Sequence, residues 1–441
     1  MTKKITFSLL AIIISGCLII SAGVIAGAWF LLKSEKNYTP PTQDPVELLS
    51  EDEQMDLIQE QVTEIRGLQM NSPLDRAMLT SADLEDMVVN DFFKDYTAED
   101  ARDDVNILSA IGLLDKDFEL LQFYKELYSE QIAGFYDSET KEMNVVSDSG
   151  FHGLERMTYA HEFTHVLQDQ NYDLQDGLKL NDETCEQDSE YCAAVTALIE
   201  GDATLSEQYW FLMNSTNKDK TDVSDFQSTY ESPIFDSAPA FMRQDFLFPY
   251  QQGMSFVNSL YSQNKWASVD EAYLDPPVST EQILHPEKYP NEKPVEVELP
   301  DLAAELGDGW RETDRNQMGE WYTYLILSTG IDPNMRLSDK AAKTASEGWG
   351  GDVYAYYDKR NSSDYVFLWR SAWDTQKDAE EFFMNSSDYG KLRWGEATDE
   401  NNRTVSWGKT VSMHCQGSEV LWIISNRSEE RRVGKECRSR W

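Results

Sequence analysis

The sequence predicts an α+β protein, with a mainly helical region over residues 50–289 that includes a small sheet, and a smaller α+β domain over residues 301–427. In the first region, apolar residues recur at the three- and four-residue spacing of an amphipathic helix, as in Leu57, Ile58, Val62, Ile65 and Leu68. In the second region, strand-like and helical segments follow one another in an order typical of α+β folds. A chain of 441 residues is long enough for two or three such units.

The N-terminal part contains an apolar run from Ile5 to Leu32, preceded by two lysines. Such a run is long enough to span a bilayer, so we expect residues 1–33 to form an uncleaved transmembrane signal anchor. The segment that ends at Cys17 also resembles a bacterial lipobox, in which case Cys17 would carry a lipid anchor instead. Residues 34–49 are polar and contain three prolines, as expected of a linker. Both alternatives attach the chain to the cell membrane with the remaining residues outside the cytoplasm.

The composition limits the partners of this protein. A formal net charge of −41 argues against a nucleic-acid-binding surface and suits a protein that must stay soluble outside the cell. Of the five cysteines, Cys185 and Cys192 flank a short polar segment before an apolar helix. Outside the cytosol they are candidates for a disulfide. The alternative is a pair of free thiols, whereas a zinc site built from them would need a second matching pair.

The pattern over residues 50–130 predicts a layer of helices, and Thr80 and Thr97 are predicted N-caps. We expect this layer to pack against the core that follows, although a removable pro-segment is an alternative. Two strand-like segments, 133–137 and 143–146, then flank a polar turn and predict a hairpin.

The most informative stretch is the H-E-x-x-H pattern formed by His161, Glu162 and His165. Positions four apart lie on one face of a helix, so the two histidines can bind one metal ion. Neutral imidazoles suit Zn²⁺, which in catalytic sites usually takes three protein ligands and keeps a position for water. Glu162 would then accept a proton from that water. The alternative reading is two histidines on an ordinary amphipathic helix.

A third ligand is expected on a second, antiparallel helix. Glu200 follows His165 by 35 positions (200 − 165), and it ends an apolar, helix-favouring run over 193–199. A metal ion would offset the cost of burying this carboxylate. The alternative is a glutamate at a helix end that faces water.

With Glu200-Gly201 followed by Ala203, the chain resembles the gluzincins, zinc metallopeptidases with two histidine ligands and a downstream glutamate. With Gln168-Asp169-Gln170 added, the string is similar to a group of membrane-anchored surface proteins of bacteria and archaea. The resemblance implies a zincin-like catalytic core over residues 50–289, zinc on His161, His165 and Glu200, and Glu162 as general base. It also implies that residues 143–147 form an edge strand that lines the cleft. It implies no particular substrate.

A further donor usually shares the negative charge of the attacked carbonyl with zinc. His285 has the right side-chain type and lies in a turn-forming segment before Pro286, so we predict this role for it. Tyr250 and Tyr289 are the competing candidates. A histidine that only bonds a loop carbonyl is the structural alternative.

The remaining segments have simpler readings. Residues 214–228 are predicted to be a polar loop, 290–300 a linker, and 348–352 a tight turn before a strand. The basic stretch over residues 428–441 breaks with the acidic character of the chain, and we expect it to be a non-native tail.

The sequence therefore predicts a membrane-anchored, extracytoplasmic zinc metallopeptidase that hydrolyses a peptide or protein substrate. One alternative is a surface binding protein whose zinc site is structural or no longer catalytic. Another is a zinc hydrolase that acts on a bond other than the peptide bond.

Overall fold

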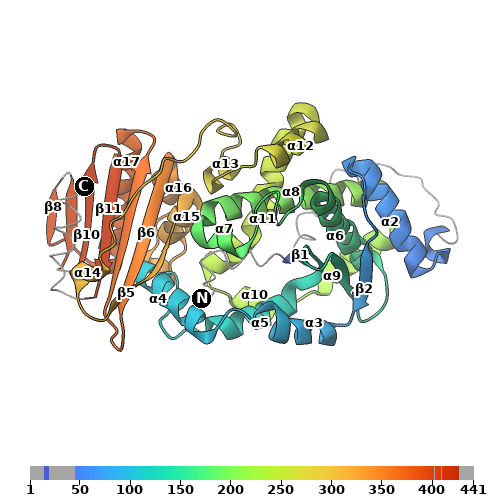
Figure 1. Ribbon diagram of the computed structural model, residues 1–441, viewed down its shortest axis with the longest axis horizontal. Helices are drawn as coiled ribbons and strands as arrows, with labels where there is room; N and C mark the ends of the chain where they lie inside the picture. Colours follow the sequence, from blue (N-terminus) through green and yellow to red (C-terminus); the bar gives the residue numbers. More distant parts are fainter. Residues whose placement is uncertain (1–13, 19–44, 402, 409, 427–441) are drawn as a thin grey trace.

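The computed structural model describes residues 14–18, 45–401, 403–408 and 410–426. A helical body and a seven-stranded antiparallel sheet lie side by side in an elongated molecule (Figure 1). The sheet forms one end, and helices α6, α8 and α11 form the middle. The predicted α+β class, with a helical core and a C-terminal α+β part, is confirmed.

The elements of the helical body are, in chain order, β1 (Ile14–Leu18), η2 (Pro45–Leu48), α2 (Glu51–Arg66), β2 (Asp75–Leu79), α3 (Ser81–Met87), η3 (Val88–Phe92), α4 (Ala98–Ile111), α5 (Leu120–Gln131), β3 (Ile132–Asp137), β4 (Glu142–Val146), α6 (Gly153–Tyr172), α7 (Asp182–Gln187), α8 (Ser189–Asn214), α9 (Asn217–Thr229), α10 (Pro233–Ser237), α11 (Ala240–Asn264), α12 (Trp266–Leu274) and α13 (Thr280–Leu284).

The C-terminal part follows an extended segment over 290–302 and contains, in chain order, α14 (Ala303–Leu306), β5 (Trp310–Asn316), α15 (Gly319–Ser328), η4 (Pro333–Met335), α16 (Asp339–Ser346), β6 (Trp349–Lys359), β7 (Tyr365–Trp373), α17 (Gln376–Trp394), β8 (Asp399–Asn401), β9 (Thr404–Trp407), β10 (Val411–Gln416) and β11 (Glu419–Ser425).

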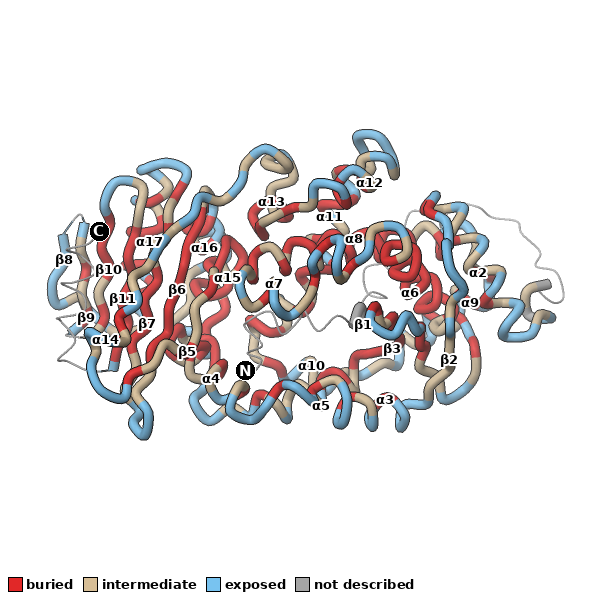
Figure 2. The backbone as a smooth tube through the Cα atoms, in the orientation of Figure 1, coloured by how far each residue is buried: buried red, intermediate tan, exposed pale blue. Residues whose placement is uncertain are grey.

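Helices α6 and α8 form the centre of the helical body, and most of their residues are buried (Figure 2). Side chains are buried around most of the circumference of both, as expected of helices surrounded by other elements. Helix α8 also lies very close to α11, because a Cβ built on Gly201 would lie 2.2 Å from the backbone of Gly253. Only residues without a side chain fit at this crossing, so the two glycines fix the distance between α8 and α11.

A small four-stranded sheet with the order β1-β3-β4-β2 covers one side of α6. Strand β4 lies between β3 and β2, so the expectation that residues 143–147 form an edge strand is wrong. Strand β3 instead carries β1 on its outer side, in antiparallel pairing. Strand β2 interrupts the predicted helical layer, because Asp75–Leu79 gains its backbone hydrogen bonds from parallel pairing with β4. Pairing with a strand so distant in the sequence leaves no local sequence pattern from which β2 could be predicted.

Most of the predicted anchor, residues 1–13 and 19–33, lies outside the described residues, and so does the predicted tail. Residues 14–18 are described and form β1. In the described part of the chain, each helix is too short or too polar to cross a lipid bilayer.

The predicted loop over 214–228 is largely helix α9. Thr216 and Asp219 cap its first turn reciprocally, and the Asp219 carboxylate accepts a hydrogen bond from Arg156 of α6 at 3.0 Å. Both partners of this ion pair are buried. The polar residues that suggested a loop are therefore the cap and the anchor of a helix.

Helix α2 is joined to the core by a buried charge cluster. The Arg66 side chain is fully buried, donates to Asp202 of α8 at 2.8 Å and to Asp270 of α12 at 2.7 Å, and lies over the ring of Trp266. Since an unpaired buried charge is costly, each member of the pair depends on the other. The structure therefore favours an integral layer over a removable pro-segment for α2.

In the C-terminal sheet the strands follow the order β5-β6-β7-β11-β10-β9-β8. Tyr354 and Tyr356 of β6 belong to the large core that the sheet shares with the helices, while Ala355 and Tyr357 pack with Leu302 of the extended segment before α14. Arg311 of β5 pairs with Asp103 of α4 at 3.0 Å, which ties the sheet to the helical body.

Candidate metal centre

Three predicted ligands converge between α6 and α8. The Nε2 atom of His161 lies 3.2 Å from Oε2 of Glu200, and Nε2 of His165 lies 3.5 Å from the same oxygen. The imidazole rings are 4.9 Å apart and steeply inclined to each other. All three side chains are buried. The three ligand atoms lie within 4.8 Å of one another, so one ion can contact all of them.

These separations agree with the size of a zinc site. Ligand atoms about 2.1 Å from a tetrahedral ion are about 3.4 Å from each other. The observed 3.2 and 3.5 Å bracket that value. Moreover, Nε2 of His165 is buried and has no hydrogen-bond partner among the described residues. A buried nitrogen without a partner is costly unless a ligand satisfies it, so the donor set fits a metal ion.

A carboxylate orients the first histidine. The Nδ1 atom of His161 lies 2.9 Å from Oε2 of Glu207, which is about two turns after Glu200 on the same face of α8. If Nδ1 carries the proton and donates it to Glu207, the lone pair of Nε2 points to Glu200 and the candidate ion position. Carboxylates that accept from the distal nitrogen of a metal-binding histidine fix its tautomer in this way.

An amide orients the second histidine. The Nδ1 atom of His165 lies 2.8 Å from Oε1 of Gln168. The Nε2 group of Gln168 donates to the carbonyl of Ile199 at 3.0 Å and to Oδ2 of Asp202 at 3.1 Å. Because both of these partners are acceptors, the amide oxygen must face His165, and Nδ1 must be the protonated nitrogen. His165 therefore also presents the lone pair of Nε2.

Without a metal ion, the site balances charge with protons. Burial alone would lower the pKa of His161, but hydrogen bonds to Glu200 and Glu207 outweigh it and raise the pKa to about 10. Burial would raise the pKa of Glu200, but His165 and His161 outweigh it and lower the pKa to about 2. Burial raises the pKa of Glu207. An anionic Glu200 is the form that a cation requires.

Strand β3 crosses α6 at the predicted general base. A Cβ built on Gly134 would lie 2.7 Å from Cγ2 of Thr158 and 3.3 Å from Cγ of Glu162. Glycine thus allows the backbone of β3 to approach Glu162. The strand that borders the site is therefore β3, and not β4 as expected.

Of the three candidate donors, only Tyr250 is beside the ligands. Its ring centroid is 6.3 Å from that of His161, and the side chain is buried. Tyr289 instead donates to the carbonyl of Asp275.

His285 lies in a different place from the one predicted. Its Nε2 atom is 2.9 Å from Oε1 of Glu320 in the C-terminal part. Thr280, at the start of the short helix α13 that His285 caps, donates its backbone N–H to the carboxylate of Glu190 in the first turn of α8 at 2.8 Å. Glu190 precedes Glu200 by ten residues (200 − 190), which is about 15 Å of helix. The sequence could not show this, because the partner of His285 is 35 residues away (320 − 285).

The structure joins Cys185 of α7 and Cys192 of α8 by a disulfide, which holds α7 at the start of the helix that carries Glu200. A second acidic group, Glu281, Glu292 and Asp374, surrounds the ammonium of Lys288, which contacts all three carboxylates. The negative charge of this acidic group is thus already paired with the ammonium of Lys288.

Residues 305–433 match a family model described as a domain of unknown function (DUF8575). This match covers the C-terminal part, outside the candidate metal centre. No curated protein and no solved structure matches the chain.

Proposed function

We propose that this protein is a zinc metallopeptidase whose metal ligands are His161, His165 and Glu200. The observation that carries the proposal is the convergence of both Nε2 atoms on one buried carboxylate oxygen, at separations that suit tetrahedral zinc. A structural zinc site would use a fourth protein ligand and would not require Glu162. Zinc bound there supplies a Lewis acid and lowers the pKa of water toward neutrality.

The protein groups have separate tasks. Glu162 accepts a proton from the attacking water and delivers it to the leaving amine. Glu207 and Gln168 hold the two imidazoles in the tautomer that leaves Nε2 free to bind. The Tyr250 hydroxyl is the donor that stabilises the negative charge on the attacked carbonyl oxygen, in place of His285.

Strand β3 supports a peptide as the substrate. Its outer side is paired in antiparallel register with an extended segment of the chain, β1, and Gly134 brings this pairing beside Glu162. An extended peptide can add to a sheet edge through the same main-chain hydrogen bonds. A peptide substrate that paired with β3 would take the position that β1 occupies in the structure.

The substitution Glu162→Gln tests the proposal. It preserves the size of the side chain and removes the base, so zinc content should stay at about one per chain while turnover of a mixed peptide library falls at least ~10²-fold. His165→Ala should lose the metal as well. Wild-type protein that is fully loaded with zinc and cleaves none of the peptides would favour the binding-protein alternative.

A further inference from the structure

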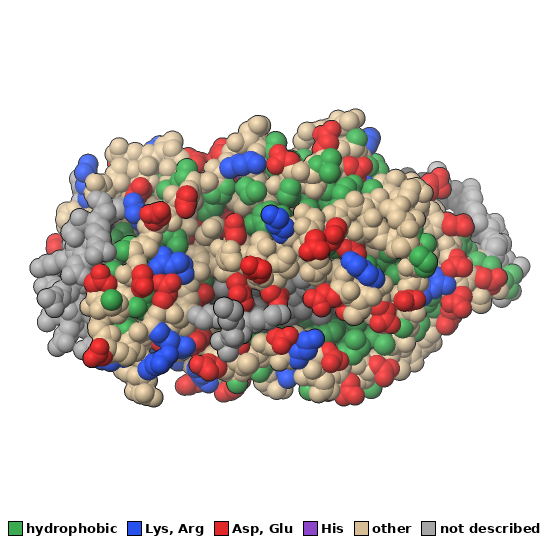
Figure 3. Space-filling view, in the orientation of Figure 1, with side chains coloured by type: hydrophobic (Ala, Val, Ile, Leu, Met, Phe, Trp, Pro, Cys, Tyr) green, Lys and Arg blue, Asp and Glu red, His purple; other side chains and the backbone are tan. Residues whose placement is uncertain are grey.

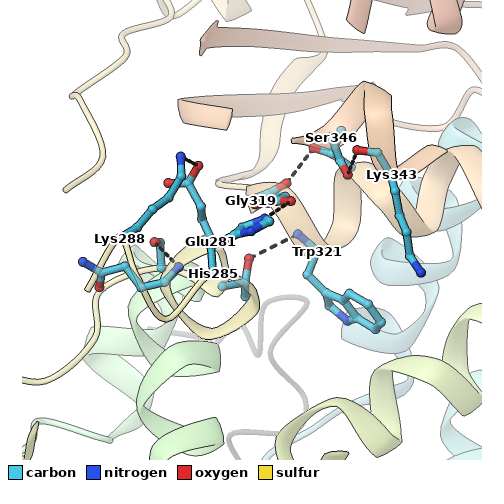
Figure 4. Close-up of polar contacts among 12 residues, drawn as sticks. Glu281, His285, Lys288, Gly319, Trp321, Lys343 and Ser346 are labelled. Atoms are coloured by element: carbon cyan, nitrogen blue, oxygen red, sulfur yellow. Dashed lines mark hydrogen bonds and ion pairs between the residues drawn. The ribbon is translucent and has the colours of Figure 1, made fainter. Parts of the chain in front are cut away.

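A pocket of about 560 Å³ lies between α11 of the helical body and helices α15 and α16 of the C-terminal part. Its volume is within the range of ordinary ligand sites. Trp321 and Lys343 extend from α15 and α16 in the same direction, with Trp321 on the side of His285 (Figure 4). Such clefts between two parts of a chain are common binding sites.

The pocket is separate from the metal centre. Gln244 lines it, and Gly253, nine positions later on α11 (253 − 244), contacts Gly201 of α8. Nine residues are two and a half turns of helix, so the two lie on opposite faces of α11. The thickness of one helix, about 10 Å, therefore lies between the pocket and the helix that carries Glu200.

One wall of the pocket presents polar groups that the fold does not use. The side-chain amides of Gln244, Gln251 and Gln252 make no hydrogen bond with any described residue, and the carboxylate of Glu347 on the opposite wall forms no ion pair with one. The side chain of Phe248 is buried between the glutamines and provides an apolar floor.

The end of the pocket is a buried acidic group. Glu320 is 4% exposed, and only one of its oxygens, Oε1, has a partner among the described residues, namely His285 at 2.9 Å. Lys343 on the rim is paired with Asp339 at 3.1 Å. Among the charged residues that line the pocket, Glu347 is therefore the one that forms no ion pair with a described residue.

These groups match one chemical class of ligand. A carboxamide carries one donor group and one acceptor, which are also the hydrogen-bonding groups of a peptide unit. Gln244 and Gln252 are eight positions apart (252 − 244), or about 12 Å along α11, which spans three to four residues of extended peptide. The apolar floor suits a side chain of that peptide.

Charge favours a basic peptide. Glu347 is available to a lysine or arginine side chain, and the net charge of −41 draws cations toward the protein. Acidic side chains are spread widely over the face of the molecule in Figure 3. We propose that the pocket between α11 and α15–α16 binds an extended peptide segment that carries a basic side chain.

Binding of a defined probe tests this site independently of metal chemistry. The probe is an end-blocked, fluorescein-labelled Gly-Ala-Lys-Leu-Lys-Ala-Gly peptide, and its comparison has both lysines replaced by glutamate. Full-length protein carrying Glu162→Gln leaves the probe intact, and fluorescence anisotropy is measured with and without a chelator. The lysine peptide should bind at least ~10-fold more tightly than the glutamate peptide, in both conditions.

Variants locate the binding. Glu347→Gln and Gln252→Ala should each weaken binding of the lysine peptide about 3- to 10-fold. Gln263→Ala is the matched control, since Gln263 is an exposed glutamine of α11 outside the pocket. Equal binding of both peptides, or unchanged binding in both pocket variants, would overturn the proposal. Loss of peptide binding on addition of the chelator would show that the peptide binds at the metal centre. Binding of chitotriose, and not of the lysine peptide, would show that the pocket binds glycans.

Discussion

Gln168 joins His165 to the opposite ligand helix: its amide oxygen lies 2.8 Å from Nδ1 of His165, while its amide nitrogen donates to the carbonyl of Ile199, the residue before Glu200. One side chain thus sets both the tautomer of a proposed metal ligand and the spacing of α6 and α8. Its own orientation is fixed by Asp202, which in turn is paired with Arg66.

We therefore expect Gln168→Leu to reduce zinc affinity about 10- to 100-fold while the protein still folds, because His165 loses its orienting acceptor. Competition with a chromophoric chelator measures the dissociation constant. Gln170→Leu is the matched control: Gln170 is on the same helix and is equally well bonded, but to the backbone of residues 71 and 72. Equal zinc affinity in both variants would contradict the role of Gln168.

Tyr250→Phe is expected to lower kcat at least ~10-fold with little change in KM. The substitution keeps the ring beside His161 and removes the hydroxyl that we assign to the developing oxyanion. His285→Ala should leave kcat nearly unchanged, since His285 is bonded to Glu320 away from the metal ligands. Steady-state kinetics on the zinc-loaded proteins compares the two variants. A larger fall in kcat for His285→Ala than for Tyr250→Phe would instead identify His285 as the donor.

The His285–Glu320 pair should make docking of the C-terminal part depend on pH. The hydrogen bond to Glu320 raises the pKa of His285 above 6.5, and burial raises the pKa of Glu320. Because the folded protein holds the His285 proton more tightly than the unfolded chain, this contribution is complete below pH 6.5 and is lost as pH rises through the raised pKa. Thermal unfolding of wild type and His285→Gln should differ most at low pH and converge at high pH. A constant difference would contradict the assignment.

The Cys185–Cys192 disulfide should appear in protein exported by its native host, and peptide mapping would detect it. It closes a short loop, with a separation of seven residues, so its removal should cost about 2 kcal/mol in the free energy of unfolding. Urea unfolding of the Cys185→Ala, Cys192→Ala double variant measures that cost. Two free thiols in the exported protein would also weaken the assignment to the outside of the cell.

The convergence of the three proposed ligands was predictable because it follows from short-range spacing in the sequence. His161 and His165 share a helix face, and the apolar run before Glu200 marks a carboxylate that is carried into the interior. Gln168, three residues after His165 on the same face, and Glu207, seven after Glu200, could have been found by the same periodicity. Their polar side chains on buried faces were the available signal.

The errors concern contacts between distant segments. The sequence favoured His285 over Tyr250 as the donor, and only the packing of α11 on α8 and of α13 on α15 places Tyr250 beside the proposed ligands instead. Strand β2 was missed for the same reason, since its partner β4 lies 67 residues further along (142 − 75). Helix α9 was missed because its cap residues have the composition of a loop.

The Arg66–Asp202 pair also sets a limit on how this protein can be released from its predicted membrane anchor. A chain that began after residue 66 would keep all three proposed ligands and Glu162, but it would bury the Asp202 carboxylate without its arginine, directly behind Gln168. A cut before Pro45 would remove β1 but would leave α2 and the Arg66–Asp202 pair in place. A cut beyond Arg66 would release a unit in which Asp202, the partner of Gln168, has lost the arginine that balances its charge.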